Sequence, residues 1–335
     1  MRYSGVFRPW GNLAWLFPKL PKGRFKFAGC LGTEDRCLTA FQELSNLGRI
    51  DEKTFVRILD PESDYSALAY KKRDANLKHL TAIGVSNHEI REIGLLDTED
   101  AIVSWIDDVA EGTDRLVIDI SSLPKRFFFP AIKLLLQNAS IRNLIVTYTI
   151  PASYHQGNLA ERPSDWRALP LFSPEVFPDP TYEIAVVGVG FLPFGLPDLL
   201  KSGFLTPKPY LFFPFPATPS TNFKTWEFVR QINESLTLDT DDQLIRVNAL
   251  DPSDAFDHIC WLTESNRRNA LFAPYGPKPM SLGIAIYAAL TGSPVYYTQP
   301  RVYHPDYSKG VQYTNSHPDV YAYCLKLNGS NLFSI

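Results

Sequence analysis

The sequence predicts an α/β protein made of two tandem Rossmann-like halves, each built on a parallel sheet, that are related by pseudo-twofold symmetry. The first observation is length, because 335 residues with 45% hydrophobic composition suffice for two ordinary domains with full cores. The second is that strand-like and helix-like segments alternate, as in parallel sheets covered by helices. The third is an internal repeat, since residues 146–155 match residues 295–304 at Val, Tyr, Thr, Pro, Tyr and His.

The repeat divides the chain into three expected parts. Residues 1–24 form an N-terminal arm, residues 25–200 the first half and residues 201–335 the second half. The first half is the longer one. Its extra residues are expected as a helical insertion at about 62–112, where apolar residues recur at helical spacing.

The elements of each half are expected in the same order. The strand-like runs of the first half are residues 25–28, 55–59, 116–120 and 146–150. Those of the second half are residues 210–213, 245–250, 270–273 and 295–298. An Asp-Pro pair, which starts turns, closes the second run of each half. A Pro-Lys pair and an apolar helical run follow the third.

Composition excludes several classes of function. The net charge of −3 leaves no surplus of Lys and Arg for binding duplex DNA. The uncharged stretch at residues 184–197 is broken by glycines and prolines and is too short to span a bilayer, so we expect no membrane partner. The four cysteines lack C-x-x-C spacing and the histidines lack ligand spacing. We therefore expect a cytoplasmic protein without disulfides, metal or cofactor.

The loop after the third strand of the first half is the first candidate site, because ligands of open α/β sheets bind beyond the carboxyl ends of strands. It carries Asp119, Ser121, Ser122 and Lys125. Its hydroxyls can cap the next helix or bind a phosphate, and the lysine adds a positive charge. The alternative is an ordinary helix cap with a solvated lysine.

Two other loops carry candidate ligand residues. The corresponding loop of the second half contains Tyr275, Gly276 and Lys278, and its glycine permits close approach of a ligand to the backbone. The first loop of the first half contains Gly32 and Thr33, which can form a tight turn and a helix cap. Neither loop has the G-x-G-x-x-G spacing of a dinucleotide site.

The repeated block supplies the second candidate constellation. Tyr154 and His155 in the first half correspond to Tyr303 and His304 in the second. The histidines could act as acid and base on a phosphodiester, and the tyrosines could stack on a base. The alternative is that these side chains only close a loop through hydrogen bonds.

The arrangement Asp-x-hydroxyl-hydroxyl-x-x-Lys after a core strand resembles the loop of CARF domains, Rossmann-like sensors of cyclic oligoadenylates. A tandem of two resembles the SAVED variant of that family, although Ala273 stands where the second copy would have aspartate. The resemblance implies a nucleotide or cyclic oligonucleotide second messenger, bound in a cleft between the halves, in prokaryotic defence signalling. The ligand contacts it implies are Asp119, Ser121, Ser122 and Lys125, and more loosely Tyr275, Gly276 and Lys278.

Three functions are compatible with these patterns. The first is binding of such a ligand, with an effector protein encoded separately. The second is metal-independent cleavage of the ligand, with His155 or His304 as acid and base. The third is a non-catalytic interaction subunit whose aromatic residues, such as Trp10, Trp15 and the run 127–129, anchor a partner.

Overall fold

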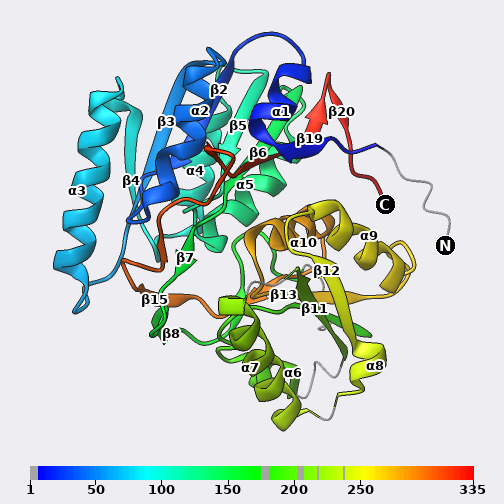
Figure 1. Ribbon diagram of the computed structural model, residues 1–335. Helices are drawn as coiled ribbons and strands as arrows, with labels where there is room; N and C mark the ends of the chain where they lie inside the picture. The colour runs from blue at the N-terminus through cyan, green and yellow to red at the C-terminus, as the bar shows by residue number, and fades with distance from the viewer. Residues whose placement is uncertain (1–6, 175–180, 202–206, 217–218, 237) are drawn as a thin grey trace. The chain divides into compact units, whose positions relative to one another are not determined.

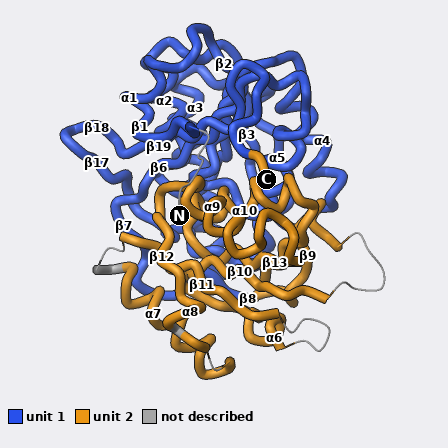
Figure 2. Tube along the Cα trace, turned by 90° about the vertical axis from the view of Figure 1, so that its right-hand side faces the viewer, with its two compact units in different colours: residues 1–162, 300–333 blue, residues 163–299, 334–335 orange. Residues whose placement is uncertain are grey.

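The computed structural model describes residues 7–335, except for residues 175–180, 202–206, 217–218 and 237. The described chain forms two compact units (Figure 2). Unit 1 contains the residues up to Arg162 and residues 300–333, and unit 2 contains residues 163–299 with the last two residues of the chain. The chain therefore leaves unit 1 and later returns to it.

Unit 1 is built on a mixed sheet. Within the described residues its strands are β1 (Trp10–Asn12), β2 (Phe25–Cys30), β3 (Ile50–Leu59), β4 (Ile90–Gly94), β5 (Arg115–Asp119), β6 (Asn143–Thr149), β19 (Val320–Leu327) and β20 (Ser330–Asn331). Their order is β1-β19-β6-β5-β2-β3-β4, with β20 paired to β19 (Figure 1). The strands β2, β3, β4, β5 and β6 are parallel to one another, as the alternation predicts. Strand β19, near the C-terminus, is antiparallel to both β6 and β1.

The helices of unit 1 lie between its strands in sequence, and all of those described except η3 bury apolar residues. They are α1 (Leu13–Leu16), η1 (Phe17–Lys19), η2 (Asp35–Leu38), α2 (Thr39–Asn46), α3 (Ser66–Ala82), η3 (Asn87–Glu89), α4 (Glu99–Ala110) and α5 (Lys125–Gln137). Phe41 of α2 packs on Phe27 of β2 and Phe55 of β3, with ring centroids 5.3 and 5.4 Å away. Packing of this kind, more than helix propensity, stabilises a helix as short as α2.

Unit 2 is built on a smaller sheet that is parallel throughout. Its strands are β10 (Ile184–Gly188), β11 (Lys208–Phe215), β12 (Leu244–Asn248) and β13 (Ala270–Pro274), in the order β12-β11-β10-β13. Val295 forms a further parallel bridge to Phe272 of β13. The helices are α6 (Leu196–Lys201), α7 (Pro219–Ser235), α8 (Thr240–Gln243), α9 (Pro252–Leu262) and α10 (Lys278–Thr291).

Short antiparallel pairs complete the described structure. In unit 1, β7 (Ser153–Tyr154) pairs with β16 (Ser308–Lys309), and β17 (Tyr313–Thr314) with β18 (His317–Pro318). In unit 2, β9 (Arg167–Ala168) pairs with β14 (Tyr296–Tyr297). Where the chain leaves unit 1 and where it returns to it, β8 (Ala160–Pro163) pairs with β15 (Pro300–Tyr303). No helix among the described residues is both long and apolar enough to cross a membrane.

The two units divide the chain differently from the predicted boundary between residues 200 and 201. The first strand of unit 2 is β10, which lies well before that boundary and pairs with β11 and β13. The C-terminal strand β19 instead joins the sheet of unit 1. These long-range pairings decide the division. The two sheets share the same order of parallel strands, while the pseudo-twofold relation of the halves stays a prediction.

The predicted helical insertion at about 62–112 is an integral part of unit 1. It contains α3 and α4, as the helical spacing predicts, but between them lies β4, which pairs in parallel with β3. The buried side chains of Ile102, Trp105 and Ile106 bind α4 to the core. The N-terminal arm is also part of unit 1, because β1 pairs with β19.

Candidate functional site

The carboxyl edge of the unit 1 sheet has a topological switch point between β5 and β2. The chain passes from β2 through β3 to β4 on one side, and from β5 to β6 on the other. Ligands of open α/β sheets bind at such a point, where neighbouring loops diverge. The loop after β2 carries Gly32 and Thr33, and the loop after β5 carries Ser122. Three predicted ligand residues therefore flank the switch point.

These two loops touch each other through a side chain. The Ser122 hydroxyl donates to the carbonyl oxygen of Cys30 over 3.0 Å. A Cβ on Gly32 would be only 3.1 Å from the Cβ of Ser122, so the close approach depends on the glycine. Gly32, Thr33, Ser122 and Lys125 remain partly exposed. Each of the four is therefore accessible from solvent.

Asp119 and Ser121 lie beneath the switch point and have no solvent exposure. Oδ1 of Asp119 accepts hydrogen bonds from the hydroxyls of Ser121 (2.7 Å) and Thr147 (2.9 Å). The Ser121 hydroxyl in turn accepts from the backbone N–H of Thr149 over 2.8 Å. Buried polar groups need such partners. The burial of Asp119 and Ser121 does not fit direct ligand contacts, and their bonds fix the β5 loop to β6.

Lys125 and Lys278 occupy equivalent local positions in their own units. Each is the first residue of a helix, α5 or α10, that follows a parallel strand. Each is preceded by an N-cap proline with extended backbone: Pro124 has φ −60° and ψ 151°, and Pro277 has φ −54° and ψ 153°. Both lysines are half-buried at a helix N-terminus, where negative charge is favoured.

The switch point of unit 2, between β10 and β13, is filled by the protein's own backbone. A Cβ on Gly190 would be 2.0 Å from the carbonyl oxygen of Tyr275, and a Cβ on Gly276 would be 3.1 Å from that of Val189. Tyr275 is buried, its hydroxyl donates to the carbonyl of Phe194 over 2.8 Å, and burial raises its pKa to about 12. Gly276 and Tyr275 therefore serve loop packing, whereas the sequence predicts ligand contact.

We expect Gly276→Ala to lower the free energy of unfolding by about 1–3 kcal/mol, the usual cost of overpacking a filled core. The new methyl group would lie 2.9 Å from Sδ of Met280 and 3.1 Å from the carbonyl oxygen of Val189. Urea unfolding without ligand measures this effect. An unchanged free energy of unfolding would contradict the packing role assigned to Gly276.

Arg36 anchors the carboxyl edge, although it belongs to no motif that would select it as a site residue. Its side chain is 3% exposed, and Nη1 donates to the carbonyl of Thr149 over 2.8 Å. Nε donates to Glu34 over 3.0 Å, and Glu34 also accepts from the Ser308 hydroxyl. Burial alone lowers the pKa of Arg36, but Glu34, Tyr148 and Tyr154 raise it above its ordinary value. The group therefore stays charged and ties the β2 loop to β6.

Both predicted Tyr-His pairs lie in unit 1, and this corrects the expectation that each half holds one. The rings of His155 and His304 stack on each other, with centroids 3.9 Å apart and planes tilted by 11°. Tyr154 and Tyr303 each make an edge contact with Tyr307 at 6.2 Å. The reason is the return of the chain to unit 1, where β15 pairs with β8 and β16 with β7.

The surroundings of His304 favour its neutral form. Nδ1 accepts the backbone N–H of Asp306 over 3.0 Å, which leaves no room for a proton on that nitrogen. Tyr65 lies against the ring edge at 4.8 Å and donates its hydroxyl to Glu161 over 3.2 Å. Burial and the neighbouring His155 lower the pKa of His304.

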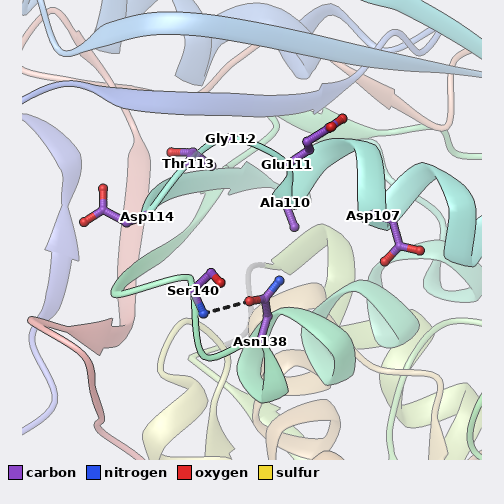
Figure 3. Close-up of a pocket in the computed structure, with 8 residues that line it drawn as sticks. All are labelled: Asp107, Ala110, Glu111, Gly112, Thr113, Asp114, Asn138 and Ser140. Atoms are coloured by element: carbon purple, nitrogen blue, oxygen red, sulfur yellow. Dashed lines mark hydrogen bonds between the residues drawn. The ribbon is translucent and has the colours of Figure 1, made fainter.

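A separate depression of about 500 Å³ lies at the amino edge of the unit 1 sheet (Figure 3). Its lining comes from the end of α4, the turn into β5 and the segment after α5. Asp107, Glu111 and Asp114 line it without a basic residue. Such a lining repels phosphate, and it contains no predicted site residue. Within the described residues, no group of three or more His, Cys, Asp or Glu side chains is placed to hold a metal ion.

The aromatic residues predicted to anchor a partner differ in accessibility. The run 127–129 is fully buried in α5, so it cannot serve as an anchor. Trp10 is half-buried beside Tyr321 and Tyr323, whereas Trp15 is 57% exposed with Lys19 over its ring. A single exposed tryptophan does not define an interface.

No protein-family model and no curated protein sequence matches the chain. Among solved structures, the chain is similar to a protein of Pseudomonas aeruginosa UCBPP-PA14 assigned as a universal stress protein, at 13% identity and a TM-score of 0.26 over 82% of this chain and 93% of that one. A functionally unknown protein of P. aeruginosa PAO1 gives 13% identity and a TM-score of 0.24 over 82% and 92%. The cytoplasmic domain of a prokaryotic cation chloride cotransporter gives 10% identity and a TM-score of 0.25 over 85% and 99%. Likeness at this level carries no argument about the site.

Proposed function

We propose that unit 1 binds a phosphate-bearing nucleotide at the switch point between β5 and β2. The observation that carries this proposal is the placement there of a close-approach glycine, a hydroxyl and a lysine at a helix N-terminus. These groups belong to Gly32, Ser122 and Lys125, and all three are partly exposed. Lys125 supplies positive charge at a helix N-terminus, and the Ser122 hydroxyl can donate to a bound phosphate when it gives up its bond to the Cys30 carbonyl.

The base of the nucleotide would meet aromatic side chains on the same edge. Tyr154 and His155 follow β6, the strand next to β5 in the sheet, and both are half-buried. Flat side chains of this kind bind bases of any sequence by stacking. A cyclic oligonucleotide, which combines several phosphates with several bases, fits such an edge as well as a mononucleotide does.

The proposal uses the two units unequally. In unit 2 the equivalent loops are packed through Gly190, Tyr275 and Gly276, all of which are buried. Lys278 therefore stands beside a closed switch point, and Lys125 beside one that is partly exposed. The cleft between symmetric halves and a role in prokaryotic defence remain predictions of the family resemblance.

Cleavage of the ligand by two histidines fits the geometry less well. With ring centroids 3.9 Å apart, nothing can lie between His155 and His304. General acid and general base would have to act on opposite sides of one phosphorus atom, which this stack prevents. We therefore expect offered nucleotides to remain intact in EDTA, as mass spectrometry would show.

Thermal unfolding tests the proposal without knowledge of the ligand's exact identity. A nucleotide that binds only the folded chain stabilises it by about 2.7 kcal/mol at one hundred times its dissociation constant. We expect cyclic di- and trinucleotides, or their linear forms, to raise the unfolding temperature, and the corresponding nucleosides to have no such effect. An equal rise in unfolding temperature with nucleosides would contradict the claim that the phosphate contributes to binding.

A further inference from the structure

Two chain segments of unit 1 form a strap beside the proposed site, defined here as residues 151–162 and 300–310. They are joined by the pair β7·β16, with Tyr154 opposite Ser308, and by the pair β8·β15. His155 follows β7 and His304 follows β15, so the stacked rings lie between the two strand pairs. The strap also holds the β2 loop, because Ser308 donates to Glu34 and the N–H of Gly310 donates to Asp35 over 2.8 Å.

We propose that the His155–His304 pair is a pH-sensitive contact that holds the two segments of this strap together. Neutral rings stack and keep the segments paired, and protonation of both rings separates them and frees the β2 loop. Any effect of strap opening on ligand affinity rests on the proposed nucleotide site, whereas the opening itself does not depend on that proposal.

The stack is incompatible with two positive charges. Two imidazolium rings face to face at 3.9 Å would repel each other, so the stack is disfavoured when both rings carry a charge. Protonation of Nδ1 of His304 would also remove the acceptor for the backbone N–H of Asp306. Each protonation thus costs the closed strap a specific interaction.

Other charges near the pair do not cancel this effect. Asp306 favours a charged His304, but it is engaged with Lys72 of α3 and with Lys309, which lies 3.7 Å away. Tyr65 packs against the His304 ring in a T-shaped contact, and Glu161 accepts the Tyr65 hydroxyl. The titratable groups that face His304 are His155, Asp306, Lys72, Lys309 and, through Tyr65, Glu161.

The strap is a segment that can open by itself. Two-residue strands such as β7 and β16 contribute few backbone hydrogen bonds, and Ala152, Ser153 and Lys309 are exposed. Local opening of such segments requires much less free energy than unfolding of the whole unit. Protonation of His304 therefore acts on a part of unit 1 that few backbone hydrogen bonds hold closed.

The sign of the pH dependence follows from the lowered pKa of His304. A histidine whose pKa is lower in the closed strap than in the open one stabilises the closed form fully above its ordinary pKa, near 6.5. That contribution is lost as the pH falls below this value. The strap should therefore open on acidification, while α5 and the central strands stay closed.

Hydrogen exchange followed by mass spectrometry, without nucleotide, tests the proposal. Between about pH 8 and pH 5, where histidine titrates, we expect exchange in peptides from the strap to rise about tenfold after correction for intrinsic rates. Peptides from α5 serve as the internal reference. Equal protection of the strap at both pH values would overturn the proposal.

The variant His155→Gln with His304→Asn removes both charges and keeps a side-chain acceptor near Asp306. We expect it to show little rise in exchange, whereas His317→Gln, at an exposed site, should behave like the wild type. A full rise in the double variant would contradict the proposal. If the strap of the double variant is open at every pH, the single variant His155→Gln replaces it as the test. In that variant a charged His304 has no second charged ring beside it. The rise in strap exchange between pH 8 and pH 5 must then be smaller than in the wild type.

Failure of this proposal is distinguishable from failure of the nucleotide site. If exchange depends on pH as expected but no nucleotide binds, only the proposed function is wrong. If nucleotide binds at pH 8 but strap exchange is insensitive to pH, only the proposal for the His155–His304 pair is wrong.

Discussion

Asp119→Ala is expected to lower the free energy of unfolding by about 3 kcal/mol, because it leaves two buried hydroxyls without their acceptor. The hydroxyls belong to Ser121 and Thr147, which donate to Asp119 over 2.7 and 2.9 Å. All three residues have no solvent exposure, so water cannot replace the lost carboxylate. Urea unfolding monitored by circular dichroism measures the effect.

A matched control separates this network from the general effect of removing a carboxylate. Asp64 is exposed, and Asp64→Ala should change the free energy of unfolding by less than about 0.5 kcal/mol. A loss of less than about 1 kcal/mol in Asp119→Ala would contradict the supporting role assigned to Asp119. It would reopen the prediction that this residue contacts the ligand.

Lys125→Ala is expected to weaken nucleotide binding by about ten- to a hundredfold, the range for loss of a charge-assisted hydrogen bond. Lys125 is half-buried at the first residue of α5, beside the partly exposed switch point. Isothermal titration of the variant against the wild type measures the change, and its thermal unfolding shows whether the fold is retained.

Lys278→Ala is the matched control, because Lys278 has the same local position in unit 2. Its switch point is filled by Gly190 and Tyr275, so the substitution should change the affinity by less than about twofold. The double variant should then equal Lys125→Ala. An equal loss from Lys278→Ala would contradict the unequal use of the two units.

Much of the architecture could be predicted because parallel strands and their helices leave local patterns. The alternation of elements, the helical spacing in α4 and the Pro-Lys helix starts after β5 and β13 are all visible in short windows. The position of β4 could not be predicted in this way, since a five-residue strand between two helices resembles a loop within an insertion. Only its pairing with β3 shows that it belongs to the sheet.

The candidate site could be predicted only in part, for a related reason. Loops at strand ends were found correctly, but burial decides whether a side chain there meets a ligand or the fold. Asp119 and Ser121 are turned to neighbouring strands, and Gly276 to the loop after β10. Arg36 lies outside any motif, and its partners Glu34, Thr149 and Ser308 are brought together by the fold.

The repeated block shows how sequence similarity can mislead about partners. Residues 146–155 and 295–304 occupy the same place in the order of elements, after α5 in unit 1 and after α10 in unit 2. In the second copy, however, the chain returns to unit 1 within the block, so that Val295 bridges to β13 while His304 stacks on His155. No local pattern marks the point where the chain changes units.

Isothermal titration of the wild-type chain with cyclic di- and trinucleotides and their linear forms tests the central claim most directly. The account predicts heat from at least one of these compounds, with one site per chain, and loss of that heat in Lys125→Ala but not in Lys278→Ala. Absence of heat from every compound, with a chain that is folded by circular dichroism, would contradict it.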